Sequence, residues 1–343
     1  MLNNERNGIL AAGNWILDEV KLIDKFPQEQ SLVNILDEYT SNGGSAYNIL
    51  CALVRLGVTF PLEAIGLVGN DSHGKNILTH CQSIGINIKQ LQIIDDLPTS
   101  YTVVVSVKES AKRTFFHHRG SNSKLDFEHF NFDLSNAKIF HLGYLLLLDK
   151  LDEINTYGRT NASLLLENAK QKGFITSIDL VSETSDRFTK IVPSALPYVD
   201  YLFLNEYEAS QLSTIDIMHE NPPIEMKKRC HEVFEKIFAM GVNEWIIIHY
   251  PAGLWAGHRS GKRIFQPSLK LKKEDIVGNN GAGDALAAGV LLGVHEGWAM
   301  DDSLNLGVCV AAASLFDVTC SGGIHDYQTC LDLGKNKGYN LSL

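Results

Sequence analysis

Short apolar runs alternate with longer segments of helical pattern along this chain, and that alternation constrains the fold more than any other feature. Strand-length runs at 62–69, 174–180 and 242–250 are separated by segments such as 43–57, in which apolar residues recur at helical spacing. Repeated strand–helix units predict a mostly parallel sheet covered by helices on both faces. The predicted fold class is therefore α/β.

One β-rich region departs from this alternation. The runs at 100–107 and 113–118 are joined by the polar segment "KESAK", which predicts a hairpin. Because this hairpin lies inside an α/β chain, we interpret it as a lid beside the main sheet. Near the N-terminus, residues 7–20 predict a single strand that ends near Asp18.

Length and composition narrow the classes of protein to consider. The 343 residues suit one large α/β domain with an appendage, or two domains. The net charge of −10 argues against a nucleic-acid groove, which needs a basic face. No apolar run approaches the roughly 20 residues of a membrane span, and the first fifteen residues do not resemble a signal peptide. The six cysteines lack C-x-x-C and zinc-ligand spacing, which predicts reduced, buried thiols. We therefore expect a cytoplasmic protein without nucleic-acid or membrane partners.

The stretch "GNDSHGKN" at 69–76 differs at one position from a phosphate-binding P-loop. Gly69, Gly74 and Lys75 match the pattern G-x-x-x-x-G-K-[ST] between a predicted strand and a predicted helix. The eighth residue is Asn76, where a P-loop needs a Ser or Thr hydroxyl as a magnesium ligand. We favour a plain strand-to-helix turn with an exposed Lys75, and a P-loop NTPase is the alternative.

The stretch "GNNGAGDALAAG" at 278–289 combines bare backbone with a single carboxylate. Gly281, Ala282 and Gly283 leave three N–H groups with little side-chain cover at a predicted helix start, where the helix dipole favours negative charge. Such amides suit the charge that develops in phosphoryl transfer, and Asp284 is placed to take a proton from an attacking hydroxyl. The alternative is a helix start at which Asp284 only stabilises the dipole.

Four motifs together resemble the PfkB, or ribokinase-like, carbohydrate kinases. The stretch at 278–289 is similar to the C-terminal signature of that family, and 43–57 is similar to its N-terminal signature. The stretch "VGNDSHGKNI" resembles the V-G-x-D-x-x-G turn of the family, and "LNEYEA" at 204–209 resembles its N-x-x-E motif. The motifs occur in the family's order between residue 13 and about residue 323, so the resemblance covers nearly the whole chain.

The resemblance implies a ribokinase-like α/β fold: a mostly parallel central sheet flanked by helices, with a small β lid. It implies a single domain over 1–343, with the lid formed by inserted β segments around 14–22 and 98–120. The implied activity is transfer of a phosphoryl group from ATP, with Mg²⁺, to a hydroxymethyl group of a sugar or sugar-like acceptor. Lids of this family often pair between two subunits, so a homodimer is expected.

The resemblance also assigns roles to individual residues. It places Asp284 as the general base and the backbone of Gly281, Ala282 and Gly283 as the anion hole. Sugar contacts are implied for Asp18, Gly43, Gly44 and Asn48. Nucleotide contacts are implied for Asn205, Glu208, Gly253 and Asn279, with Glu208 also organising Mg²⁺ through water. Without the resemblance, Asp18 reads as an exposed loop acid, Asn48 as a polar residue of a helix start and Glu208 as a helix-start acid that stabilises the dipole.

Some positions depart from the family pattern. Gly278 stands where the family has an Asp that helps to hold a monovalent cation beside the anion hole. Val181 and Glu183 replace the Asn and Arg of a frequent D-x-N-x-R pattern, and His249 stands where Thr or Lys is common. These changes concern the surroundings of the cation and the nucleotide, so we expect catalysis with an altered dependence on potassium.

The lid leaves the acceptor open. Arg113, His117, His118 and Arg119 suit the carboxylate of a sugar acid or a phosphate, or else form a solvated strand edge. A nucleoside kinase of the same fold is an alternative, because Tyr101, Phe115 and Phe116 offer aromatic surfaces near the lid. A non-catalytic sugar-binding regulator on the same fold is a further alternative, although Asp284 and the G-A-G segment argue against it.

Overall fold

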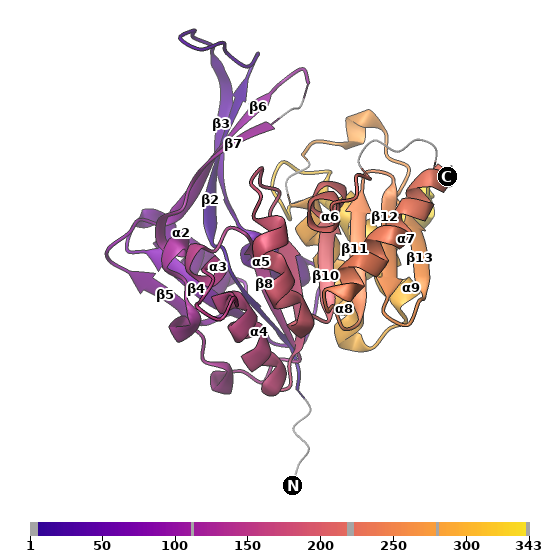
Figure 1. Cartoon of the computed structure of the whole chain (residues 1–343). Helices are drawn as coiled ribbons and strands as arrows, with labels where there is room; N and C mark the ends of the chain where they lie inside the picture. Colours follow the sequence, from indigo (N-terminus) through magenta and orange to yellow (C-terminus); the bar gives the residue numbers. More distant parts are fainter. Residues whose placement is uncertain (1–5, 111–112, 218–222, 279–280, 341–343) are drawn as a thin grey trace.

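The computed structural model describes residues 6–110, 113–217, 223–278 and 281–340, and its centre is a nine-stranded sheet (Figure 1). The strand order is β13-β12-β11-β10-β9-β8-β1-β4-β5. Neighbours from β11 to β5 pair in parallel, whereas β12 and β13 are antiparallel. The strands are β1 (Ile9–Ala12), β4 (Leu62–Gly69), β5 (Asn87–Ile94), β8 (Ile139–Leu145), β9 (Ile175–Leu180), β10 (Tyr201–Asn205), β11 (Trp245–Tyr250), β12 (Gly253–His258) and β13 (Arg263–Pro267).

Helices cover both faces of this sheet (Figure 1). Successive residues of a strand point to opposite faces, so β1 sends Ile9 and Ala11 into one apolar cluster and Leu10 and Ala12 into another. The first cluster includes side chains of α1 (Ser45–Arg55), α2 (Ser72–Ser83), α8 (Ala282–Glu296), α9 (Met300–Ser314) and α10 (Tyr327–Lys337). The second includes side chains of α3 (Asp149–Asp152), α4 (Asn161–Gln171), α5 (Phe188–Ala195), α6 (Glu206–Ser213) and α7 (Pro223–Ala239).

The strand order reverses direction between β1 and β8. From β1 the main sheet continues through β4 to β5 on one side, and β8 to β11 follow on the other. In open α/β sheets, ligands bind outside the carboxyl ends of the strands at such a switch point. A Cβ on Gly13, which follows β1, would lie 2.4 Å from the carbonyl oxygen of Gly143 in β8. A Cβ on Gly143 would lie 2.4 Å from Ser45, the first residue of α1. These glycines bring β1, β8 and α1 together at that edge.

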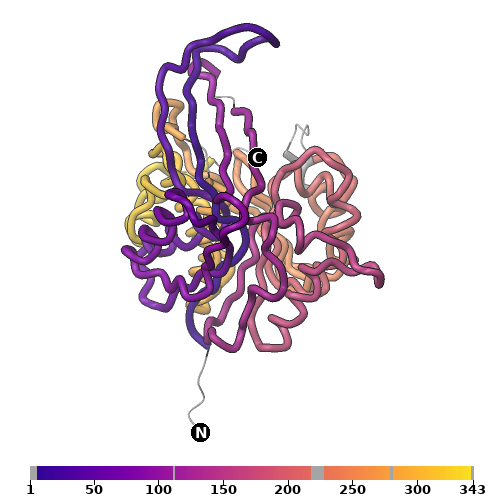
Figure 2. Tube along the Cα trace, turned by 90° about the vertical axis from the view of Figure 1, so that its left-hand side faces the viewer, coloured from indigo at the N-terminus to yellow at the C-terminus, as the bar shows by residue number. Residues whose placement is uncertain are grey.

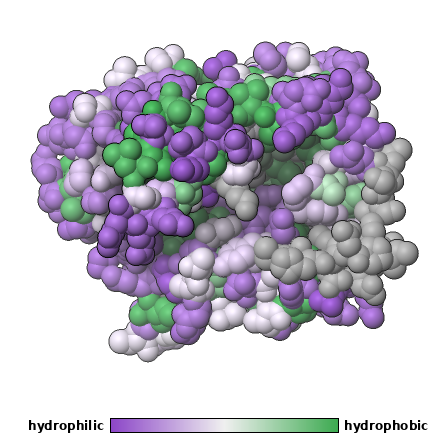
Figure 3. Space-filling model, turned by 90° about the horizontal axis from the view of Figure 1, so that it is seen from above, coloured by the Kyte–Doolittle hydropathy of each residue, from purple (hydrophilic) through white to green (hydrophobic). Residues whose placement is uncertain are grey.

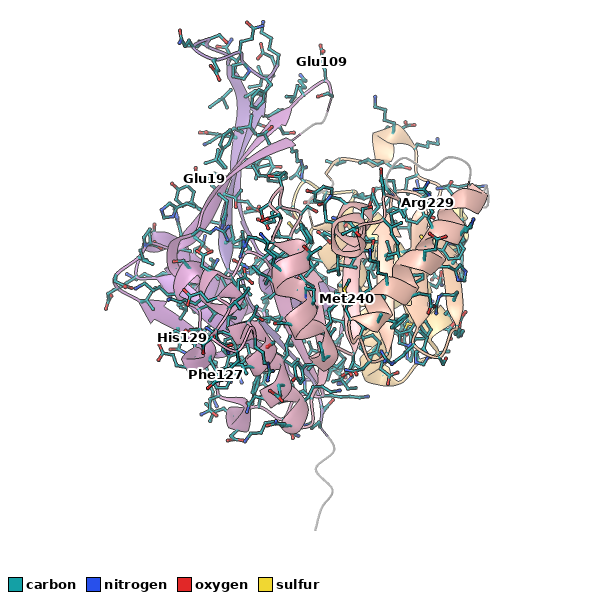
Figure 4. All side chains as sticks on the ribbon, viewed as in Figure 1. Glu19, Glu109, Phe127, His129, Arg229 and Met240 are labelled. Atoms are coloured by element: carbon teal, nitrogen blue, oxygen red, sulfur yellow. The ribbon has the colours of Figure 1, made fainter. Side chains whose placement is uncertain are left out.

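A second, four-stranded sheet rises from the main body (Figures 1 and 2). Its order is β3-β2-β6-β7, and β2 and β6 pair in parallel. We call this sheet the lid. Glu19 lies on β2, and Glu109 lies near the far end of the lid (Figure 4). The strands are β2 (Ile16–Ile23), β3 (Ile35–Gly43), β6 (Ser100–Val107) and β7 (Arg113–His118). The predicted hairpin over 100–107 and 113–118 is confirmed.

The single strand predicted over 7–20 is wrong. β1 ends at Ala12, the backbone turns at Gly13 with a φ of 128°, and β2 begins in the lid at Ile16. Trp15 anchors the turn, because its indole N–H donates to the carbonyl of Ile65 at 2.9 Å. A hydrophobic run therefore crosses from one sheet to another, and sequence periodicity alone does not show the crossing.

The predicted α/β fold with a mostly parallel, helix-covered sheet and a small β lid is confirmed by this architecture. Its division as a single domain with lid segments around 14–22 and 98–120 stays a prediction. None of the helices in the described ranges combines the length and apolar character needed to cross a bilayer.

Candidate active site

Polar residues converge at the carboxyl edge of the main sheet. Tyr144 lies near the end of β8, Asp179 near the end of β9, Asn205 at the end of β10 and His249 near the end of β11. Seen from above, the surface is hollowed near its centre, and hydrophilic and hydrophobic residues both surround the hollow (Figure 3). The arrangement fits the general rule for ligand sites in open α/β sheets.

Asp284 lies in the first turn of α8 and is only 4% exposed. Its Oδ2 accepts hydrogen bonds from Asn48 Nδ2 at 2.7 Å and from the Tyr144 hydroxyl at 3.0 Å. Burial raises the pKa of Asp284 to about 7, and the negative charge of Asp179 adds to the rise. The hydrogen bonds from Asn48 and Tyr144 oppose it. A carboxyl group whose pKa lies near neutrality is suited to act as a general base.

Asp179 is a second buried carboxylate beside this group. Its Oδ2 accepts a hydrogen bond from the Ser45 hydroxyl at 2.6 Å, and its Oδ1 accepts one from the backbone N–H of Tyr144 at 2.5 Å. His141 lies behind Ser45, with Nε2 at 3.2 Å from the hydroxyl oxygen. Two carboxylates therefore share one buried polar network, a setting that pushes the pKa of at least one of them upward.

The predicted anion hole lies at the N-terminus of α8. Gly281 is the N-cap and has a φ of 73°, in the left-handed region that favours glycine. Because Gly281 carries no side chain, it cannot cap the first-turn N–H groups, which stay available to an anion. A Cβ on Gly283 would lie 3.2 Å from the ring of His249. Burial lowers the pKa of His249 to about 4, so its ring is neutral at physiological pH and the helix end supplies the positive potential.

The predicted sugar-contacting residues meet beside Asp284. Asp18 is buried on β2, and a Cβ on Gly43 would lie 2.6 Å from its Oδ2. Gly44 has a φ of 93°, and a Cβ there would lie 2.2 Å from the carbonyl oxygen of Asn14. Asn48 is already bonded to Asp284. Burial is the largest cause that raises the pKa of Cys320, and the charges of Asp18 and Asp284 are the next largest. Both carboxylates therefore lie near that thiol.

Buried amides in this region have unused hydrogen-bonding capacity. Asn14 is fully buried, yet neither its Oδ1 nor its Nδ2 has a partner among the residues that the structure describes. Within the same described ranges, Asn48 Oδ1 also lacks one. Buried polar atoms are normally paired, so unpaired ones need an explanation such as a bound polar ligand. A polyol, whose hydroxyls both donate and accept, matches these amides.

Asn205 and Glu208 form a tight pair at the start of α6. The Asn205 N–H donates to Glu208 Oε2 at 2.9 Å, and the Glu208 N–H donates to Asn205 Oδ1 at 2.8 Å. Glu208 Oε1 also accepts a hydrogen bond from Ser182 at 2.8 Å. Burial raises the pKa of Glu208 to about 8. The pair is a capping box, which agrees with the helix-start role considered for this acid.

The role of Glu208 in organising Mg²⁺ through water stays a prediction, and the bonding of its carboxylate disfavours direct ligation. Both of its carboxylate oxygens already accept hydrogen bonds from the protein. In the described part of the chain there is no group of three or more His, Cys, Asp or Glu residues that could hold a metal. Mg²⁺ usually keeps several waters and binds through substrate phosphates, so a site with few protein ligands suits it.

The remaining nucleotide-side predictions are less closely tied to Asp284. Gly253 begins β12 after the turn that follows β11, with a φ of 151°, and a Cβ there would lie 2.4 Å from the carbonyl oxygen of Gln266. Asn279 lies outside the described residues. A cavity of about 430 Å³ lies between the end of α9 and α10. Its lining includes Ala313, Phe316, Gly322, Gly323, His325 and Leu333.

Register across the lid sorts its side chains into two faces. Directly paired residues share a face, so Thr102 and His117 lie on the face of Asp18. The same register places Phe115 and Arg113 on that face, and Tyr101 and Phe116 on the other. Of the three aromatic residues considered for a nucleoside, only Phe115 therefore lies on the face of Asp18.

The two lid arginines differ. Burial raises the pKa of Tyr39 and Cys320, and the positive charge of Arg113 opposes both rises, so Arg113 lies near these two residues. Arg119 follows β7 and forms an ion pair with Asp149 at 3.2 Å. That contact gives Arg119 a structural partner.

The near P-loop at 69–76 does not form a phosphate cradle. Asp71 caps α2 and accepts hydrogen bonds from the N–H groups of Gly74 and Thr99, both at 2.8 Å. The carboxylate thus occupies the place that a phosphate would take, and its charge would repel one. Lys75 is exposed on α2. The plain strand-to-helix turn favoured from the sequence agrees with these contacts.

We expect Lys75→Ala to leave kcat and the KM for ATP within about twofold of the wild type, because the side chain is exposed and its turn is already closed by Asp71. Steady-state kinetics with MgATP checks this. A loss of most of the activity in a folded variant would instead assign phosphate binding to Lys75.

Sequence reasoning missed Tyr144, Asp179, Ser45 and Asn14 as site residues. Tyr144 and Asp179 stand at the ends of predicted strands, where ligand residues gather. That position is a signal, although it does not show which strand-end residues reach Asp284. Asn14 follows a glycine at a break in an apolar run, which marks a turn near the switch point.

Comparison with known proteins identifies the family of this chain. The family model described as "pfkB family carbohydrate kinase" matches residues 13–329. Adenosine kinase 1 of Arabidopsis thaliana is 24% identical over 306 residues, covering 87% of this chain and 84% of that protein. A 5-dehydro-2-deoxygluconokinase of Clostridium perfringens is 26% identical over 291 residues, covering 81% and 79%.

Solved structures show the same fold. The ribokinase of Arabidopsis thaliana, complexed with ribose and ATP, superposes with a TM-score of 0.78 at 20% identity, covering 96% of this chain and 98% of that one. The nucleoside kinase of Methanocaldococcus jannaschii gives a TM-score of 0.72 at 19% identity, with the same coverage. Because the family model spans well over half of its length, this chain belongs to the pfkB family of carbohydrate kinases.

Proposed function

We propose that this protein transfers the γ-phosphoryl group of ATP to a hydroxymethyl group of a sugar or sugar-like acceptor. The observation that carries the proposal is the position of Asp284. A buried carboxyl group with a raised pKa stands in the first turn of α8, directly after the bare backbone of 281–283. A base and an anion-binding helix end are the two groups that an alcohol-to-phosphoryl transfer requires.

The residues divide the reaction between them. Asp284 takes the proton of the acceptor hydroxyl while the hydroxyl oxygen of the acceptor attacks the γ-phosphorus in line. Asn48 and Tyr144 both donate to Oδ2, which holds the carboxylate in one orientation. The N–H groups at the start of α8 stabilise the charge on the phosphoryl oxygens. No covalent intermediate with the enzyme is needed, because acceptor and donor bind together.

The nucleotide is assigned to the side of α9 and α10. The cavity of about 430 Å³ there is lined by both apolar and polar residues, as a nucleotide base needs. The Asn205–Glu208 pair would hold Mg²⁺ through water. Mg²⁺ supplies charge neutralisation on the phosphates when it is bound. ATP as the donor is supported by the Arabidopsis thaliana ribokinase, which was solved with ATP.

The acceptor side favours a polyol. Asp18, the amide of Asn14 and the Oδ1 of Asn48 offer several partners for adjacent hydroxyls, and the two amide groups have no partner for these atoms among the described residues. Arg113 on the same face of the lid supports the inclusion of sugar acids and phosphorylated sugars among the acceptors. A nucleoside is less well supported, because Phe115 alone of the lid aromatics considered faces this side.

The homodimer stays a prediction. Several apolar side chains of the lid are exposed, which agrees with coverage by a second copy. They are Ile35, Leu36, Phe115 and Phe116.

The test is a coupled assay of ADP release with MgATP against ketoses, pentoses, keto-sugar acids, phosphorylated sugars and nucleosides, in sodium and in potassium. We expect one sugar-like class to stimulate ADP release. We also expect equal rates in both salts, because Gly278 lacks the carboxylate of the family cation site and a Cβ there would lie 2.5 Å from the carbonyl oxygen of Asp317. Binding of sugars without any ADP release would instead favour the regulator.

A further inference from the structure

Tyr144 connects the two buried carboxylates of the site. Its backbone N–H donates to Asp179 Oδ1 at 2.5 Å, and its side-chain hydroxyl donates to Asp284 Oδ2 at 3.0 Å. Asp179 lies on β9 and Asp284 on α8, so one residue of β8 joins three elements. Any shift of Asp179 would therefore also move Tyr144, and with it the hydroxyl that donates to Asp284.

The backbone of Tyr144 is unusual for this purpose. Its φ is 55°, in the left-handed region that a tyrosine rarely adopts, and Leu146 has a φ of 80°. The pairing of β8 with β9 is also irregular between Leu142 and Leu145. Such strain persists only where the surroundings hold it, and it is concentrated at functional sites. Here it turns the N–H of Tyr144 toward Asp179 and its side chain toward Asp284.

Ser45 provides a second link between the carboxylates. Its hydroxyl donates to Asp179 Oδ2 at 2.6 Å and also interacts with Asp284, whose pKa it lowers. His141 Nε2 lies 3.2 Å from the Ser45 oxygen, and His141 Nδ1 lies 3.0 Å from the Ser177 hydroxyl. Asp179 is thus held on both oxygens, by Ser45 and by the backbone of Tyr144.

The titratable groups around Asp284 come from several elements. Tyr144 faces it from β8, and Asp179 acts on it from β9. Cys320 lies against Gly281 beyond the end of α9, and burial raises its pKa well above the usual value. His249 of β11 contacts Gly283 and is neutral. Among these described groups, Asp179 is the one whose negative charge raises the pKa of Asp284, and Asp18 of β2 lies near the same Cys320 thiol.

We propose that Asp179 is a positioning residue that, with Ser45 and Tyr144, sets the proton affinity of Asp284. The proposal rests on the role of Asp284 as the base and adds what controls it. The negative charge of Asp179 favours the protonated form of Asp284, whereas the hydroxyls of Tyr144 and Ser45 favour the ionised form. The strength of a general base follows its proton affinity, so this balance affects both the pH range and the rate of transfer.

The test is the pH profile of kcat/KM for the acceptor at saturating MgATP. Activity rises with pH as the base ionises, so the acid limb reports the base. Asp179→Asn removes a negative charge, and we expect the limb to move down by about one pH unit. Tyr144→Phe removes a donor, and we expect the limb to move up by about half a unit or more. A residue with only a structural role would lower the rate without moving the limb.

Two matched variants serve as controls. Asp200 is a buried carboxylate paired with Lys170 at the opposite end of β10, and the Tyr339 hydroxyl donates to Asn305 near the end of α10. Asp200→Asn and Tyr339→Phe should leave the limb in place. Limbs of Asp179→Asn and Tyr144→Phe that stay at the wild-type pH would overturn the proposal. If Asp179→Asn does not fold, the direction in which Tyr144→Phe moves the acid limb decides whether the proposal stands. Failure of the base assignment is distinct, because Asp284→Asn would then stay active.

Discussion

Asp284→Asn is expected to lower kcat/KM for the acceptor by between about 100-fold and about 10,000-fold, the range that general-base catalysis supplies. The amide keeps the shape of the side chain and can still accept a hydrogen bond from Asn48 or Tyr144. It cannot take the proton of the acceptor hydroxyl at physiological pH. Steady-state ADP release measures the loss, and binding of the acceptor should change much less than turnover.

The same variant should be at least as stable as the wild type at pH 8. The folded-state pKa of Asp284 is about 7, above the usual value of 3.8, because burial disfavours the charge. Ionisation therefore costs stability as the pH rises from about 4 to about 7, and the full cost is present above that range. An uncharged Asn escapes this cost. Thermal unfolding at pH 5 and pH 8 checks the sign, with the advantage of Asn larger at pH 8.

Activity close to that of the wild type in Asp284→Asn would contradict the assignment of the base. A large loss of activity together with a large fall in the melting temperature would leave the variant damaged rather than informative, and Asp284→Ser would then replace it. Asp200→Asn is the matched control, since it removes a buried carboxylate at the other edge of the sheet. It should affect stability and not turnover.

The sequence predicts the main architecture because apolar periodicity and motif order are local properties. The runs at 62–69 and 174–180 form β4 and β9, and the stretch at 278–289 covers the start of α8. The pairing of Asn48 with Asp284 agrees with the motifs that the resemblance assigned to one site. Glycines also help to predict local structure from sequence. Gly281 and Gly44 both have positive φ values, a conformation that glycine adopts readily.

The remaining features depend on contacts between distant segments. β3 is largely polar and exposed, and it is a strand because it pairs with β2, so its own pattern does not predict it. Tyr144 reaches Asp284 only because its backbone adopts a left-handed conformation, which a tyrosine at this position does not predict. Asp179 is one of several strand-end acids in the sequence. Its proximity to Ser45 follows from the packing of α1 against β8 and the pairing of β8 with β9.

Gly281→Ala should lose both stability and activity. A φ of 73° costs a side chain on the order of 1 kcal/mol, and the new Cβ would lie 2.7 Å from the Cβ of Cys320. The turn must move to relieve that contact, and it carries the N–H groups that we propose bind the phosphoryl oxygens. A displacement of about 1 Å at a catalytic group costs on the order of 100-fold in rate, so we expect a fall of that size in kcat.

Gly297→Ala separates strain from the loss of the anion hole. Gly297 caps the other end of α8 with a φ of 72°, and no atom lies within 4 Å of a Cβ built there. The two variants therefore carry the same backbone strain on the same helix, and only Gly281→Ala disturbs the site. We expect both to lower the melting temperature and only Gly281→Ala to lower kcat. A kcat that stays at the wild-type value in both variants would argue against an anion hole at 281–283, because the turn would then tolerate displacement. Equal losses of kcat would trace the effect to α8 as a whole, since strain at its far end would be enough to misplace Asp284.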